Sequence, residues 1–120
     1  DPKAKTQLEG LMHPLIQEES ARKIAQLNAH CVIYEAALLV ETKRYKELSG
    51  LIVVSCPKNI QIQRLIKRDQ MDSKLAQKII DSQLKDSERT VVADFIVDNS
   101  QSLDDLKAQV KTVFDQVKNQ

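Results

Sequence analysis

Three short apolar runs, separated by longer polar or helix-patterned stretches, set the strongest limit on what this chain can fold into. They read CVIYEA at 31–36, LIVVSC at 51–56 and ADFIVDN at 93–99. Short runs that are apolar almost throughout are typical of strands buried on both faces, and no hairpin turn joins one run to the next. The sequence therefore predicts an α/β fold with three parallel strands and flanking helices.

Helical patterns fill the intervals between these runs. After His13-Pro14, where proline suits a first helical turn, apolar residues recur at helical spacing until about Asn28. Asp72 or Ser73 is a suitable cap for a later helix. The segment KAKTQLEGLM at 3–12 is predicted to be the middle or end of an amphipathic helix, and further helices are predicted at about 14–28, 57–68, 74–83 and from Ser102 onward. The stretch LKDSERT at 84–90 is predicted to be a polar connection.

The composition excludes several classes of protein. The formal net charge of the 120 residues is only +1, so we expect one soluble domain without bulk attraction to nucleic acid. No apolar run reaches the roughly 18 to 20 residues of a membrane span, and the first residues show no signal-peptide core. Cys31 and Cys56 lie in apolar runs and are predicted to be reduced thiols on strands, so the expected location is cytoplasmic. His13 has no partner at ligand spacing, and no metal site is predicted.

The ends of the predicted strands are the expected place for a ligand. In open α/β sheets, ligands bind beyond the carboxyl ends of the strands. Glu41 follows the first predicted strand, a helix with Arg64 and Arg68 follows the second, and Asp98-Asn99 follows the third. These polar side chains are therefore the first candidates for a site.

Five segments carry a resemblance that covers nearly all of the chain. In order, they are LEGLMHPLI at 8–16, ALLVE at 37–41, QIQRLIKRD at 61–69, IIDSQ at 79–83 and ADFIVDNS at 93–100. With these segments the chain resembles the dephospho-CoA kinases. Members of that family are P-loop kinases that use ATP to phosphorylate the ribose 3′-hydroxyl of dephospho-CoA, the last step of coenzyme A biosynthesis.

The resemblance implies a partial P-loop kinase fold with a helical lid. Residues 1–30 would be a helical acceptor-side segment, 31–68 and 93–120 the core, and 69–92 the lid. The family's G-x-x-x-x-G-K-[ST] phosphate loop is not in this sequence, whose only glycines are Gly10 and Gly50. We therefore expect the C-terminal part of one kinase domain, inactive alone. The remainder of the polypeptide would complete the sheet and bind most of the Mg²⁺.

Arg64 and Arg68 lie four residues apart, which places them on one side of a helix. Planar guanidinium forks suit the charge that phosphoryl transfer spreads over equatorial oxygens. The resemblance implies catalytic, ATP-binding roles, with Arg64 near the adenine or phosphate entry and Arg68 on the phosphates when the lid closes. The alternative is a solvated helix end, where Arg68 and Lys67 favour the helix dipole.

Four further residues have both a functional and a structural interpretation. By resemblance, Arg89 would add a phosphate contact and Asn99 would contact the adenine, whereas they could equally be an ordinary loop charge and a turn residue. His13 and Glu41 would bind the acceptor substrate. Structurally, His13 would hold a helix start and Glu41 would cap the turn that follows it.

Two hypotheses about function stay open at this point. In the first hypothesis, this chain is part of an ATP-dependent dephospho-CoA kinase. Its ligands are ATP and dephospho-CoA, and neither nucleic acid nor a membrane is a partner. The second is a kinase-derived nucleotide-binding or interaction module without catalytic activity. In the family arrangement the missing first strand lies between 31–36 and 51–56, so we also expect residues 1–120 alone to self-associate or to be poorly ordered.

Overall fold

The chain forms two compact units, residues 1–35 and residues 36–120. A computed structural model describes residues 1–119, and each unit is described by itself. Over these residues, no helix is both long and apolar enough to cross a bilayer.

The first unit is built on one long helix, α1 (Pro2–Gln26). Asp1 caps it, because its carboxylate accepts a hydrogen bond from the backbone N–H of Lys3 at 3.0 Å, and Pro2 occupies the first turn. The prediction that a helix begins at Pro14 was wrong, since Pro14 lies inside α1.

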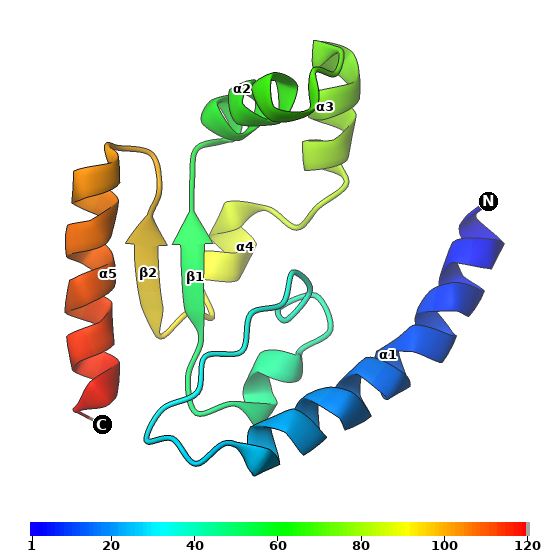
Figure 1. The fold of residues 1–120 in the computed structure, drawn as a ribbon. Helices are drawn as coiled ribbons and strands as arrows, with labels where there is room; N and C mark the ends of the chain where they lie inside the picture. Colours follow the sequence, from blue (N-terminus) through cyan, green and yellow to red (C-terminus); the bar gives the residue numbers. More distant parts are fainter. Residues whose placement is uncertain (120) are drawn as a thin grey trace. The chain divides into compact units, whose positions relative to one another are not determined.

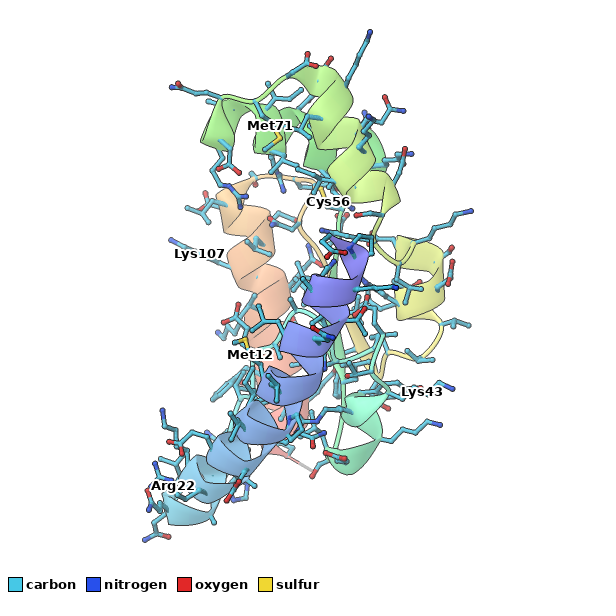
Figure 2. The ribbon with its side chains drawn as sticks, turned by 90° about the vertical axis from the view of Figure 1, so that its right-hand side faces the viewer. Met12, Arg22, Lys43, Cys56, Met71 and Lys107 are labelled. Atoms are coloured by element: carbon cyan, nitrogen blue, oxygen red, sulfur yellow. The ribbon has the colours of Figure 1, made fainter. Side chains whose placement is uncertain are left out.

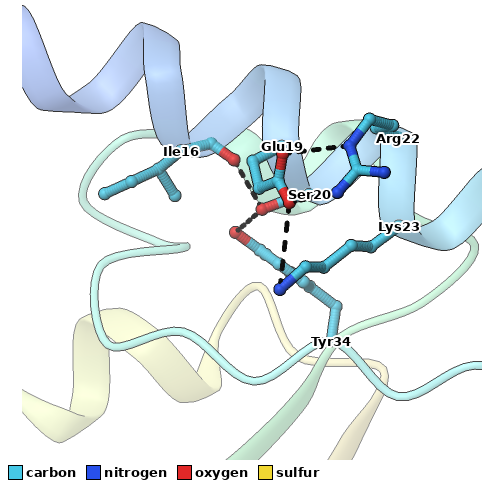
Figure 3. A network of polar contacts seen from close by, with 6 residues as sticks. All are labelled: Ile16, Glu19, Ser20, Arg22, Lys23 and Tyr34. Carbon is cyan, nitrogen blue, oxygen red and sulfur yellow. Dashed lines mark hydrogen bonds and ion pairs between the residues drawn. The ribbon is translucent and has the colours of Figure 1, made fainter.

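The segment after α1 folds back onto it through one tyrosine. The Ser20 hydroxyl hydrogen-bonds to the Ile16 carbonyl at 2.6 Å and to the Tyr34 hydroxyl at 3.1 Å, beside the ion pairs of Glu19 with Arg22 and Lys23 (Figure 3). The predicted strand at 31–36 does not form, and Cys31 is exposed in irregular backbone. A strand needs a paired neighbour, and neither strand described below pairs with this segment.

The second unit contains a two-stranded parallel sheet of β1 (Ile52–Ser55) and β2 (Phe95–Asp98). Ile52 lies opposite Phe95, and Ser55 lies opposite Asp98. Both arrows in Figure 1 point toward the same edge. Two of the three predicted strands and their parallel direction are therefore confirmed, and the sheet has two strands rather than three.

Five further elements surround this sheet. They are η1 (Arg44–Glu47), α2 (Lys58–Asp69), α3 (Ser73–Asp81), α4 (Asp86–Thr90) and α5 (Leu103–Lys118). In Figure 1, α2 and α3 pack together beyond the carboxyl ends of the strands, α4 lies beside β1, and α5 runs along β2. The elements thus leave the carboxyl edge of the sheet facing α2.

The ends of these helices follow from local chemistry. Ser102 caps α5 as predicted, with its hydroxyl oxygen accepting a hydrogen bond from the N–H of Asp105 at 3.1 Å. The prediction of a polar connection at 84–90 was wrong, because α4 forms there. Asp86 and Glu88 in its first turn and Arg89 in its last turn complement the helix dipole.

Replacing Val97 with alanine in the full-length protein is expected to destabilise it by roughly 2 kcal/mol. Val97 lies in β2 and is only 3% exposed, so losing two methyl groups leaves a cavity. Val54→Ala in β1 is the matched control, since Val54 is 59% exposed. Urea unfolding of both variants measures the difference. Equal midpoints would contradict the assignment of Val97 to the core.

Candidate functional site

The carboxyl edge of the sheet brings the exits of β1 and β2 together. The backbone N–H of Asn99 donates to the Ser55 carbonyl at 2.8 Å, which extends the ladder beyond both strands. On the other side of Asp98, the Gln109 side chain of α5 accepts from the Asp98 N–H at 2.8 Å and donates to the Asp98 carbonyl at 2.9 Å. Hydrogen bonds to β1 and to α5 therefore fix the backbone at Asp98 and Asn99, where the chain leaves the sheet.

Cys56 is the point where three elements meet at the end of β1. Its N–H donates to the Asp86 carboxylate at 3.0 Å, and its carbonyl accepts from the Gln61 side chain at 2.6 Å. Its Sγ lies 3.5 Å from Nη1 of Arg64. Figure 2 labels Cys56 where β1 leads toward α2. Cys56 thus follows the strand rather than lying in it, and it joins α2 and α4 to the strand end.

Arg64 and Arg68 share a side of α2 but have different partners. Whereas Arg64 reaches toward Cys56, the Nε and Nη2 of Arg68 each donate at 2.9 Å to the carboxylate of Asp69. This hydrogen bonding raises the pKa of Arg68 above its ordinary value and lowers the pKa of the Asp69 carboxyl. The Arg68 side chain is 74% exposed, so its fork is accessible to a competing anion.

Glu41 and Arg89 form an ion pair across 48 residues of sequence. Nε and Nη2 of Arg89 donate to the same carboxylate oxygen, Oε1 of Glu41, at 3.2 and 2.9 Å. The two side chains are only 24% and 23% exposed. From the sequence, Glu41 and Arg89 have separate predicted roles, as an acceptor contact and a phosphate contact, and the structure brings the two side chains together.

We call the three candidate arginines, Arg64, Arg68 and Arg89, the cationic edge. Arg64 and Arg68 come from α2, directly after β1, and Arg89 comes from α4, which is tied to the same strand end through Asp86. Guanidinium groups bind phosphate oxygens through paired N–H donors. A phosphate contact by these arginines stays a prediction, because Arg68 is paired with Asp69 and Arg89 with Glu41.

His13 belongs to the first unit rather than to the unit that holds the sheet. It lies half-buried on α1, in the unit of residues 1–35. Its predicted role at the acceptor substrate stays a prediction.

Sequence reasoning missed the residues that support the site: Cys56, Gln61, Asp86 and Gln109. Asp86 had a usable signal, because an acidic residue at the start of a short segment with Arg89 near its end is typical of a helix. The amides of Gln61 and Gln109 had none, since their partners are backbone groups chosen by the fold.

Among residues 1–119, no three His, Cys, Asp or Glu side chains gather closely enough to hold a metal ion. At the site edge, the Asp86 carboxylate accepts the Cys56 N–H and the Asp98 carboxylate accepts the Ser100 N–H at 2.9 Å. We therefore assign no Mg²⁺ ligand to these side chains.

Comparisons with known proteins agree on one family. The family model described as Dephospho-CoA kinase matches residues 1–105. A dephospho-CoA kinase of Syntrophotalea carbinolica is 36% identical over 92% of this chain and 54% of its own length. One from Rhizobium meliloti is 32% identical over 98% of this chain and 62% of its own length.

Solved structures give the same result for the fold. The crystal structure of TT1252 from Thermus thermophilus superposes with a TM-score of 0.82 at 25% identity, over 97% of this chain and 61% of the other. A dephospho-CoA kinase from Campylobacter jejuni gives a TM-score of 0.66 at 27% identity, over 99% and 60%. The chain thus spans between half and two thirds of the length of these relatives.

Proposed function

This chain belongs to the dephospho-CoA kinase family, and from that premise we propose that it is the C-terminal portion of a kinase acting in the cytoplasm. The complete polypeptide transfers the γ-phosphoryl group of ATP to the ribose 3′-hydroxyl of dephospho-CoA, in the last step of coenzyme A biosynthesis. The observation that carries the proposal is the family match over residues 1–105, which includes the whole cationic edge.

In the reaction, the 3′-hydroxyl oxygen forms a bond to the γ-phosphorus while the bond to the β–γ bridging oxygen breaks and ADP leaves. The hydroxyl proton goes to a base outside this segment. The residues of this chain contribute by position and charge, which are the main means of catalysis in phosphoryl transfer. Mg²⁺, which supplies charge neutralisation between the phosphates, is assigned to the remainder of the polypeptide.

The roles follow the cationic edge. Arg64 and Arg68 contact the phosphates, and Arg68 exchanges the Asp69 carboxylate for phosphate oxygens when the lid of residues 69–92 closes. A carboxylate and a phosphate group can each accept two parallel N–H bonds from a guanidinium. Arg68 therefore keeps the same hydrogen-bonding geometry when phosphate replaces Asp69. Arg89 adds a phosphate contact, and Asn99 contacts the adenine from the end of β2.

For the acceptor substrate we propose a contact from His13 and a separate one from Glu41, of which only Oε1 is engaged by Arg89. The alternative, a kinase-derived module without activity, has no observation in its favour. A module that had lost catalysis would have no chemical reason to keep three arginines at the strand ends.

An assay of the full-length protein tests this function. With Mg²⁺ and ATP, production of ADP is expected to depend on added dephospho-CoA, and the product should gain one phosphate by mass. Adenosine at the same concentration is the control acceptor. If the protein phosphorylates another nucleoside and leaves dephospho-CoA unchanged, the substrate assignment is wrong.

A further inference from the structure

We propose that Glu41 is a positioning residue for Arg89 and thereby sets how tightly the parent kinase holds the phosphates of ATP. The inference rests on the proposed function and deepens it. It starts from the ion pair of two side chains that are about three-quarters buried and come from distant parts of the sequence.

The geometry of the pair leaves Arg89 able to bind a second anion. A guanidinium has five N–H donors, and Glu41 accepts one from Nε and one from Nη2 on a single oxygen. Both N–H groups of Nη1 and one of Nη2 are then available for phosphate oxygens. Glu41 thus holds the Nε–Nη2 edge of the guanidinium plane and leaves the Nη1 edge for another acceptor.

The backbone that carries Arg89 is held as well. Asp86 lies one helical turn earlier on α4, and its carboxylate accepts the N–H of Cys56 at the end of β1. Asp86 therefore ties the helix to the strand end, and Glu41 restrains the side chain that the helix carries. Without Glu41, the helix would stay in place while the Arg89 guanidinium could adopt several rotamers.

The partial burial of the pair separates it from an ordinary surface contact. Exposed ion pairs contribute little, because solvent screens the charges and both side chains lose entropy. In the neighbouring pair of Arg44 and Glu47, at 3.5 Å, only the carboxylate is exposed: the Glu47 side chain is 63% exposed and the Arg44 side chain 21%. Glu47→Gln is therefore a matched control that removes a carboxylate from an ion pair close in sequence.

The test is a double-mutant cycle in the full-length enzyme, using Glu41→Gln, Arg89→Ala and the double variant. Glu41→Gln is expected to weaken ATP binding, measured as Kd by calorimetry, and to lower turnover by roughly 10- to 100-fold. The double variant should be no worse than Arg89→Ala, because Glu41 acts through Arg89. Glu47→Gln should match the wild type.

Additive losses in the cycle would overturn the proposal, as would a Glu41→Gln defect confined to the KM for dephospho-CoA. Glu41→Asp adds a second readout: it should restore part of the ATP affinity lost in Glu41→Gln, and equal affinities of the two variants would contradict positioning. The Kd for ATP keeps this test separate from the proposed function. A wild-type protein that binds ATP and ignores dephospho-CoA would refute the substrate, while the cycle would still decide the role of Glu41.

Discussion

Replacing Arg68 with alanine in the full-length enzyme is expected to lower kcat by roughly 10²- to 10⁴-fold. Arg68 is proposed to donate to phosphate oxygens as negative charge spreads over the transferring group, so its loss acts on the transition state. The side chain is 74% exposed and pairs only with its sequence neighbour Asp69 among the contacts described above, so stability should hardly change. Steady-state kinetics together with a thermal melt measure both effects.

Two further variants give this prediction its controls. Arg68→Lys should recover little activity, because an ammonium group cannot present the planar fork that now spans both oxygens of Asp69. Lys67→Ala removes an exposed charge from the same turn of α2 and should leave kcat within a few-fold of the wild type. If turnover is unchanged in Arg68→Ala, the catalytic role is wrong and Arg68 is a solvated residue at the end of a helix.

Expressing residues 1–120 without the rest of the parent polypeptide is expected to abolish a monodisperse, cooperatively folded state. Among the residues described, the sheet has only two strands, and just four apolar residues are buried: Leu51, Val53, Ala76 and Val97. Val54 and Ile96 on the two strands are 59% and 50% exposed. Unpaired strand edges beside exposed apolar side chains are templates for association.

Light scattering coupled to size-exclusion chromatography measures the oligomeric state of the segment. The full-length protein is the comparison, since we expect its additional residues to supply a strand next to β1. The segment should elute as a distribution of oligomers, and the full-length protein as one species. A monomeric segment with a single sharp unfolding transition would contradict this expectation.

Features that depend on residues close in sequence could be predicted, and features that depend on distant segments could not. The β-branched runs predicted β1 and β2, and Ser102 predicted the start of α5, because these choices depend on nearby residues. The run at 31–36 has the same apolar character but forms no strand, since pairing requires a neighbour that a local pattern cannot supply. Pro14 likewise lies within α1, so a proline that suits a first helical turn does not by itself mark where a helix begins.

The sequence by itself determined the family, through five matching segments, and the residue types that stand after each strand: Arg64 and Arg68 on one helix, and Asn99 at the exit of β2. Only the tertiary structure decided which partners these groups have. Glu41 meets Arg89 across 48 residues, and the Cys56 N–H meets Asp86 across 30. Such contacts depend on how the chain returns to the sheet, and a directional hydrogen bond forms only where that path brings donor and acceptor within about 3 Å.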